Sequence, residues 1–199
     1  TPELLDSLAP EAPEAIASRR DLLRINRLMG NFKWFESVFC PECACRAHCL
    51  EIGAGSGELA MRMINKSCCS TYSAIDLAPK PKDWPSTAFW HQADLFQYQG
   101  YATSEVLIAN LVLHHFSNAD LAKLGQHIQP GSIRKIVANE PARRSIHKLQ
   151  LNAGKLIGFN HVTLHDGAVS IEAGFLGDEL PFALGLDPAV WIWKTETTL

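Results

Sequence analysis

Three glycines at alternate positions give this chain its clearest chemical signal. Gly53, Gly55 and Gly57 follow a short apolar segment and lead directly into a helical pattern. A chain that turns from a strand into a helix beside a ligand cannot carry Cβ atoms where the ligand contacts its backbone. A dinucleotide loop has the spacing G-x-G-x-x-G and holds a pyrophosphate, but Glu58 stands where its third glycine would fall. Glu51, just before the loop, suits an ammonium or sulfonium group better than a pyrophosphate, so the loop favours a cationic cofactor.

Two acidic residues follow at the ends of further apolar segments. Asp76 ends the segment 73–77 about twenty residues after the loop, the usual spacing of an acid that binds a ribose. Asp94 and Leu95 end the segment 89–95.

In this order, the motifs resemble those of class I S-adenosylmethionine (SAM)-dependent methyltransferases, whose first motif has the form E-x-G-x-G-x-G. The resemblance implies SAM as the cofactor, with Asp76 as the ribose ligand, Asp94 accepting from the adenine amino group and Leu95 packing on its ring. Asn110, at the end of a fourth apolar segment, could receive the amino group of the cofactor through its side-chain carbonyl, a task that Glu51 could share. The cofactor-binding residues predicted in this way are Glu51, Gly53, Ala54, Gly55, Gly57, Asp76, Leu77, Asp94, Leu95 and Asn110.

The fourth apolar segment runs into His114 and His115, and this stretch is similar to the "L-H-H" stretch of methyltransferases related to quinone biosynthesis. Methyl transfer from a sulfonium is an in-line displacement, so positioning can supply most of the rate and a base is optional. An imidazole can accept the proton of a hydroxyl acceptor, and His115 is the first choice for that role, before His114. In the alternative interpretation, the dipeptide only shapes the cofactor pocket.

The acceptor is expected to be a small, aromatic or lipid-like metabolite, methylated at oxygen or, as the next option, at carbon. The [D/N]-P-P-[Y/F] motif of enzymes that methylate exocyclic or amide nitrogens is replaced here by Asn110-Leu-Val-Leu, which disfavours nitrogen methylation of nucleobases. Glu140 and Arg143 follow the fifth strand, near where substrates enter in this architecture, and an arginine can pair with a carboxylate or phenolate. The substrate-binding candidates are Arg143, His161, His165 and Trp34.

The predicted elements alternate between strands and helices, which indicates an α/β fold with a doubly wound, mostly parallel sheet and right-handed crossovers. This is the Rossmann-like methyltransferase fold that the resemblance implies, with ligands at the carboxyl ends of the strands. Strands are expected at 47–52, 72–77, 88–92, 105–111 and 132–139, and helices at 57–66, 118–128 and 143–156. A polar stretch containing His161 and His165 follows, then a short helix within 175–184 and a late strand at 189–194. The family usually ends in a strand hairpin, so either the last strand is shortened or the chain is truncated.

An N-terminal helical extension precedes the sheet. Apolar residues recur at three- and four-residue steps from Arg19 to Phe39, with an interruption near Gly30. The predicted domains are therefore a helical extension or cap at 1–45 and a SAM-binding domain at 46–199. In similar methyltransferases such helices often cover the cofactor cleft, although plain packing on the core is an equal alternative.

Composition limits the partners of the chain. Its 199 residues are 47% hydrophobic and 20% charged, with a formal net charge of −3, which suits a globular domain with a small-molecule substrate and gives no general attraction to nucleic acid. No apolar run could span a bilayer and no signal peptide is evident, so a cytoplasmic location without membrane insertion is expected. A homodimer is left open.

Six cysteines are expected to be reduced thiols. The cluster from Cys40 to Cys49 invites a zinc interpretation, but no second Cys pair or nearby His pair completes a tetrahedral set, so no metal is predicted.

Two other functions remain as alternatives to the methyltransferase. One is a SAM-binding regulatory or assembly protein without transferase activity. The other is a nicotinamide-dependent oxidoreductase, because Asp76 would suit the ribose of NAD equally well. The glycine spacing, Glu51 and Asp94 disfavour the oxidoreductase.

Overall fold

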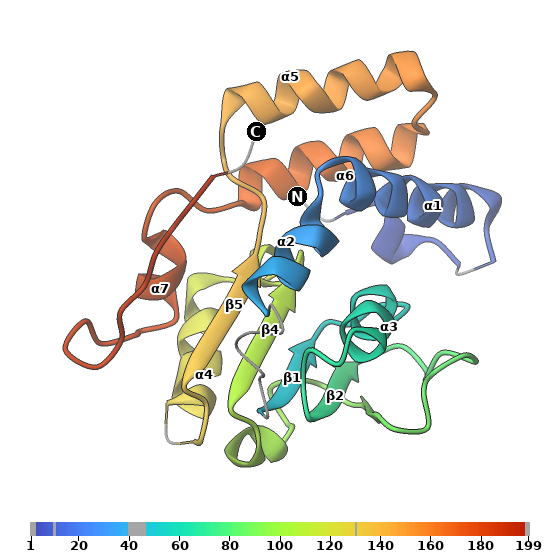
Figure 1. The fold of residues 1–199 in the computed structure, drawn as a ribbon. Helices are drawn as coiled ribbons and strands as arrows, with labels where there is room; N and C mark the ends of the chain where they lie inside the picture. Colours follow the sequence, from blue (N-terminus) through green and yellow to red (C-terminus); the bar gives the residue numbers. More distant parts are fainter. Residues whose placement is uncertain (1–2, 10, 40–46, 130, 198–199) are drawn as a thin grey trace. The chain divides into compact units, whose positions relative to one another are not determined.

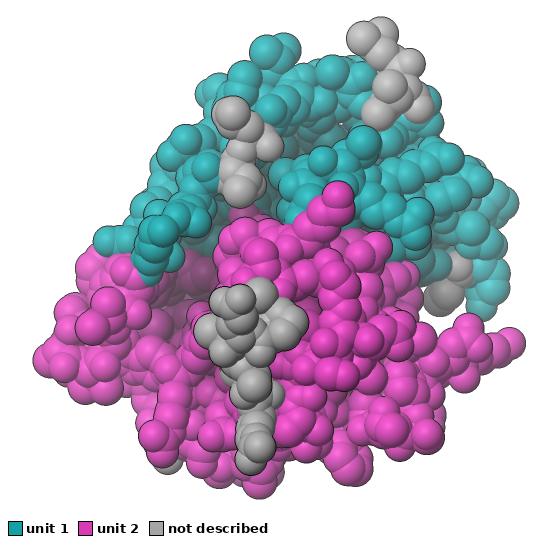
Figure 2. Space-filling model, viewed as in Figure 1, with its two compact units in different colours: residues 1–31, 141–179, 194–199 teal, residues 32–140, 180–193 magenta. Residues whose placement is uncertain are grey.

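The computed structural model describes residues 3–9, 11–39, 47–129 and 131–197, which form two compact units. Figure 2 colours them separately: unit 1 comprises residues 1–31, 141–179 and 194–199, and unit 2 comprises residues 32–140 and 180–193. The predicted boundary near residue 45 falls at residues 40–46, outside the described part of the chain. In the structure, the first long helix groups with helices from the last third of the sequence.

Unit 2 is built on a five-stranded sheet in which every strand pairing is parallel (Figure 1). The strand order is β3-β2-β1-β4-β5. The sheet consists of β1 (His48–Ile52), β2 (Thr71–Asp76), β3 (Phe89–Gln92), β4 (Val106–Asn110) and β5 (Lys135–Asn139). The predicted fold class is therefore confirmed, and each predicted strand of this run is present within a few residues of its expected bounds.

The central strands are buried on both faces, as expected for parallel strands covered by helices. One face packs against α2 (Asn31–Val38) and α3 (Glu58–Asn65), with Phe35 and Met63 fully buried among side chains from β1, β2 and β4. The remaining elements of the unit are η3 (Gly100–Thr103), η4 (Leu113–His115), α4 (Asn118–Ile128) and, at its C-terminal end, α7 (Glu179–Ala183). Figure 1 shows α4 behind β4 and β5. Its buried side carries Leu121 and Leu124.

The order of the strands reverses between β1 and β4, because β2 and β3 extend the sheet on one side and β4 and β5 on the other. In open α/β sheets, ligands bind outside the carboxyl ends of the strands at such a switch point. The glycine loop follows β1, and the residues that precede the His114–His115 pair follow β4. The topology therefore brings the two predicted motifs to the same place.

Unit 1 is helical and contains η1 (Leu5–Ser7), α1 (Pro13–Leu28), α5 (Ser145–Ala153), η5 (Gly154–Ile157) and α6 (His161–Ala173). Buried polar residues join these elements. Asp21 on α1 accepts hydrogen bonds from the backbone N–H of Asn160 at 3.0 Å and from the hydroxyl of Thr163 at 3.3 Å. Asp166 on α6 accepts the backbone N–H groups of Leu4 and Leu5 at 2.7 and 2.9 Å.

One prediction for the last third of the chain is wrong, and one stretch for which no element was predicted is helical. The polar stretch containing His161 and His165 is the helix α6, whose first turn is capped by the side chain of Asn160. The expected late strand at 189–194 is not a strand in the described residues. Val190 and Ile192 face solvent, 76% and 100% exposed, whereas Trp191 and Trp193 are half-buried, and a turn at Asp187 precedes them.

The expectation of six reduced thiols is also contradicted, because Cys49 and Cys69 form a disulfide. The register of β1 against β2 pairs His48 with Thr71, which brings Cys69, two residues before β2, within reach of β1. Cys68 is buried and lies outside this disulfide. The other three cysteines lie at residues 40–46, so the zinc question falls outside the described residues. Within the described ranges, no helix is both long and apolar enough to cross a membrane.

Candidate functional site

The glycine loop has a backbone that only glycine adopts easily. Gly53, Gly55 and Gly57 have φ angles of +64°, +57° and +81°, in the left-handed region that disfavours other residues. A Cβ on Gly53 would lie 2.3 Å from Cγ2 of Val112, so the β1 loop and the β4 loop are in direct contact. A Cβ on Gly55 would meet no atom of the described residues within 4 Å, which leaves space for a ligand beside the backbone there.

Asp76 at the end of β2 is tied to this loop. Its Oδ2 accepts the backbone N–H of Gly55 at 2.7 Å, and its Oδ1 accepts the N–H of Ala78 at 2.7 Å. A carboxylate has about four lone-pair sites, so it can also accept hydrogen bonds from a ligand. Leu77, the next residue, is 75% exposed, which leaves an apolar side chain in solvent beside the polar anchor.

Asp94 follows β3 and lies in a turn that it helps to form. Its Oδ1 accepts the backbone N–H of Phe96 at 2.9 Å. The N–H of Ala93 donates to the carbonyl of Asp76 at 3.0 Å, so the ends of β2 and β3 are joined. The carbonyl of Leu95 accepts the Tyr101 hydroxyl at 2.8 Å, which fixes the backbone of this turn.

Glu51 is buried in the sheet rather than exposed at its edge. It is 2% exposed, and its Oε2 accepts the hydroxyl of Tyr72 at 2.8 Å. Burial raises the pKa of Glu51 to about 8 despite that hydrogen bond, and the nearby Asp76 and Glu58 raise it further. At neutral pH the group is therefore mainly protonated, so it does not supply the negative charge that the sequence interpretation gave it. Burial also raises the pKa of Tyr72 well above its ordinary value.

The end of β4 meets the end of β5 through two asparagines. Asn110 accepts a hydrogen bond through Oδ1 from Nδ2 of Asn139 at 3.0 Å. Leu111, the next residue, has a φ of +56°, which for a residue with a side chain costs on the order of 1–2 kcal/mol. Its N–H donates to the carbonyl of Asn139 at 2.8 Å. A strained residue at a strand end is typical of a functional turn.

Glu140, the residue after β5, organises this turn. Its Oε1 accepts the backbone N–H groups of Val112 and Leu113 at 3.1 and 2.9 Å. Its Oε2 accepts the N–H of His114 at 3.3 Å and lies 2.7 Å from the ring Nδ1 of the same residue. The sequence placed Glu140 near a substrate entrance but gave it no role. The signal that could have found it is an acid and an imidazole following neighbouring strands.

The two histidines have different surroundings. The side chain of His114 is 4% exposed and that of Glu140 is 5% exposed, so their contact is buried. His115 is exposed, and its ring lies against the ring of His114 with centroids 4.3 Å apart. The buried hydrogen bond to a carboxylate makes His114, rather than the first choice His115, the imidazole with a fixed orientation.

The predicted substrate residues are divided between the two units, with Arg143, His161 and His165 in unit 1 and Trp34 in unit 2. Arg143 binds Glu179 through two hydrogen bonds of 2.7 and 2.9 Å and donates to the carbonyl of Gly174 at 3.0 Å. These contacts all lie within unit 1, and they hold the guanidinium of Arg143 in a structural role. His165 lies in α6 with its Nδ1 2.9 Å from Asp166.

The other two predicted substrate residues also lie on helices. His161 is the exposed first residue of α6. Trp34 lies on α2, in unit 2, where it packs against Phe35 and the core.

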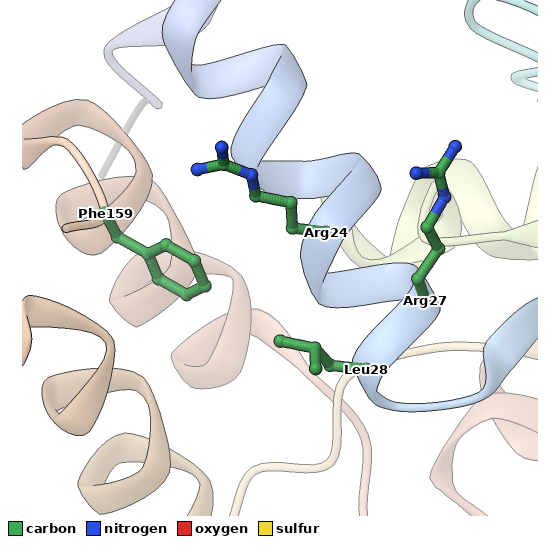
Figure 3. Close-up of a pocket in the computed structure, with 4 residues that line it drawn as sticks. All are labelled: Arg24, Arg27, Leu28 and Phe159. Atoms are coloured by element: carbon green, nitrogen blue, oxygen red, sulfur yellow. The ribbon is translucent and has the colours of Figure 1, made fainter. Parts of the chain in front are cut away.

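Unit 1 contains a pocket of about 390 Å³ lined by Arg24, Arg27, Leu28 and Phe159 (Figure 3). Figure 3 shows the apolar side chains of Leu28 and Phe159 pointing toward one another, with both arginines extending from α1. Arg24 also pairs with Asp21 at 3.1 Å. Guanidinium groups beside apolar walls suit a ligand with an anionic group and an apolar body.

Similar structures are found among solved methyltransferases. The plantazolicin methyltransferase BamL, in complex with a triazolic desmethylPZN analog and SAH, aligns with a TM-score of 0.64 and 14% identity, over 92% of this chain and 69% of its own. The plantazolicin methyltransferase BpumL in complex with SAH aligns with a TM-score of 0.62 and 14% identity, over 87% and 69%. The methyltransferase domain of bacterial-CtHen1-CN aligns with a TM-score of 0.50 and 13% identity, over 73% and 82%.

No protein-family model and no curated protein matches this sequence. The likeness to the solved structures, at 13–14% identity, concerns the fold. The chain therefore has the Rossmann-like fold of the class I SAM-dependent methyltransferases.

Proposed function

We propose that this chain is a SAM-dependent methyltransferase. The observation that carries the proposal is the hydrogen bond between Asp76 and the N–H of Gly55 at the switch point of the sheet. It joins a ribose-binding carboxylate to an accessible backbone position of the glycine loop. The plantazolicin enzymes of the same fold are complexed with SAH, which supports the choice of cofactor.

The residues at this edge fit the parts of SAM. Asp76 would accept the ribose hydroxyls, and the exposed Leu77 would contact the adenine, whose amino group Asp94 would accept. The loop at Gly53–Gly57 would hold the methionine part, and Asn110 its amino group. Bound there, SAM supplies an electrophilic methyl group on a sulfonium.

We infer that the acceptor is a small molecule methylated at oxygen. The support is His114, whose Nδ1 lies against Glu140 and whose other ring nitrogen, Nε2, is then the basic one. The acceptor hydroxyl would lose its proton to Nε2 while its oxygen forms the bond to the methyl carbon. The carbon–sulfur bond breaks with its electrons on sulfur, which leaves a neutral thioether. Carbon methylation is the second option for the same site.

Calorimetric titration with S-adenosylhomocysteine (SAH), with NADH as the comparison ligand, tests the cofactor. Selective binding of SAH is expected. Binding of NADH alone would support the oxidoreductase alternative and refute the proposal. Transfer of labelled methyl from SAM to a panel of phenols and other hydroxyl compounds then separates an enzyme from a SAM-binding protein without activity.

A pair of glycine variants makes the binding test specific to the loop. Gly55 and Gly177 both have positive φ angles, and a Cβ on either would meet nothing within 4 Å. Alanine is therefore expected to cost each a similar backbone strain, on the order of 1–2 kcal/mol. Gly55→Ala should weaken SAH binding at least tenfold, whereas Gly177→Ala should leave it unchanged. Equal affinities for the two variants would remove the loop from the cofactor site.

A further inference from the structure

We propose that Glu140 is the positioning residue of the active centre: it fixes the tautomer of His114 and holds the β4 loop against the glycine loop. The inference rests on the proposed function for its catalytic consequence. Its structural part can be tested without any substrate.

Several hydrogen-bond donors surround the Glu140 carboxylate. Glu140 accepts three consecutive backbone N–H groups, those of Val112, Leu113 and His114, at 2.9–3.3 Å, in addition to its contact with the His114 ring. Successive backbone N–H groups that converge in this way form an anion-binding nest. Because the carboxylate is only 5% exposed, its removal would leave several of these donors without a partner, at about 1–3 kcal/mol for each buried group.

The contact with Glu140 also determines which ring nitrogen of His114 carries the hydrogen. A carboxylate only accepts hydrogen bonds, so a contact of 2.7 Å places the ring hydrogen on Nδ1. In the neutral imidazole the lone pair then lies on Nε2, which is the atom able to accept a proton from an acceptor hydroxyl. In the Ser-His-Asp triad, the corresponding exchange of the carboxylate for an amide reverses the tautomer and lowers turnover by about 10⁴-fold.

Glu140 is also connected to the glycine loop through the loop that follows β4. Glu140 binds the backbone immediately after Leu111, whose left-handed φ of +56° turns the chain. This anchoring sets the position of Val112, whose side chain occupies the space where a Cβ on Gly53 would be. Glu140 therefore has two separable effects, one on the imidazole and one on the loop.

Three substitutions separate the two effects. Glu140→Gln keeps an oxygen for the N–H groups of Val112 and Leu113, but its amide can donate to Nδ1 and so favours the Nε2–H tautomer. We expect kcat to fall by roughly 10²–10⁴-fold, with SAH affinity within about threefold of the unmodified protein. Glu140→Ala removes both effects, so kcat and SAH affinity should fall together. Glu140→Asp retains a carboxylate and should restore part of the turnover.

Glu36→Gln is the matched control in unit 2, because Glu36 is also a carboxylate in ion pairs, with Arg62 at 3.0 Å and Lys66 at 2.8 Å. It is expected to leave turnover unchanged. A fall equal to that of Glu140→Gln would show that the loss of any such carboxylate has the same effect, and would overturn the positioning role.

The decisive readout is the tautomer of His114, observed by long-range nitrogen–proton correlation NMR without substrate. The unmodified protein should show the Nδ1–H form, and Glu140→Gln the Nε2–H form. An Nε2–H ring in the unmodified protein overturns the inference even if the variant does not fold. Unchanged kcat in a folded Glu140→Gln also overturns it. If the unmodified chain neither binds SAH nor transfers methyl groups, the proposed function fails, whereas the NMR result still decides the role of Glu140.

Discussion

Replacing Glu51 with glutamine is expected to make the free energy of unfolding less dependent on pH. Glu51 is 2% exposed in β1, and burial raises its pKa from 4.5 to about 8. In the unfolded chain its pKa returns to the ordinary value. Between these two pH values the unfolded chain loses a proton that the folded chain keeps, so the folded state becomes less stable as the pH rises.

The size of this effect follows from the pKa difference. Each pH unit within the window costs about 1.4 kcal/mol, so the unmodified protein should lose roughly 3–4 kcal/mol between about pH 5 and pH 8 through this one group. The loss is negligible well below pH 4.5 and complete above about pH 8. Glutamine has a similar shape, can accept the hydroxyl of Tyr72, and does not titrate, so this component disappears in Glu51→Gln.

Urea unfolding followed by tryptophan fluorescence, at a series of pH values across this window, measures the difference. The gap in unfolding free energy between Glu51→Gln and the unmodified protein should widen by roughly 3–4 kcal/mol from the acidic to the alkaline end. Parallel curves would refute the reasoning, because they would mean that Glu51 ionises alike in both states. Tyr72→Phe removes the hydrogen bond that lowers the pKa of Glu51, so it should extend the loss of stability to higher pH.

Three further substitutions test the cofactor anchor, the disulfide and the pocket in unit 1. Asp76→Ala should weaken SAH binding, measured by calorimetry, about 10- to 100-fold, because it removes charge-assisted hydrogen bonds. Cys49→Ala combined with Cys69→Ala opens a disulfide with a sequence separation of 20, which should cost about 3 kcal/mol. A thermal scan should then show Tm lowered by roughly 6–12 °C. Arg24→Gln combined with Arg27→Gln should weaken the binding of an anionic apolar probe to the pocket in unit 1 several-fold and leave the binding of a neutral apolar probe unchanged.

Each of these tests has a matched control at a position with the same chemistry. Asp83→Asn changes an exposed carboxyl group, Cys68→Ala removes a buried sulfur outside the disulfide, and Arg20→Gln changes another exposed arginine of α1. Unchanged SAH affinity in Asp76→Ala would contradict its assignment to the ribose. An unchanged Tm in the double cysteine variant would contradict the contribution of the disulfide. An unchanged affinity of the arginine variant for the anionic probe would exclude the pocket as the binding site of that probe.

The sheet could be predicted from the sequence because each strand has a recognisable local pattern of residues. β1 and β4 are short apolar runs with four consecutive buried residues each, and each ends at a polar or glycine-rich turn. Fully buried parallel strands have this pattern. The alternation of strands and helices then predicts a doubly wound parallel sheet, which the structure confirms.

The last third of the chain was harder to predict because its local signals conflict with the structure. α6 is buried through Val162, Thr163 and Asp166, so polar residues occupy core positions and no apolar stripe marks the helix. The segment 189–194 has the composition of a strand, but Val190 and Ile192 are exposed and it has no strand partner in the described residues. Composition cannot distinguish these cases, because burial there depends on contacts made far along the sequence.

The residues of the candidate site also differ in whether the sequence alone could identify them. The glycine loop and Asp76 could be found because their chemistry lies within a few residues of sequence. Glu140 and the Cys49–Cys69 pair could not be assigned, because both depend on which strands are neighbours and in which register. Asn110 lies opposite Asn139 in the sheet, and only this pairing places the carboxylate after β5 beneath the loop after β4.

The contact between Gly53 and Val112 joins the two halves of the site. Asp76 and Asp94 follow β2 and β3, so substitutions there should alter cofactor affinity alone. Val112 is held by Glu140 and packs into the space above Gly53, so changes that move this loop should alter cofactor affinity and turnover together. In a SAM-binding protein without transferase activity, the Glu140 anchor would still affect SAH binding but would have no turnover to affect. Methyl transfer by the unmodified chain therefore distinguishes the enzyme from the binding protein, and a loss of turnover in Glu140→Gln at nearly constant SAH affinity then separates the effect on the imidazole from the effect on the loop.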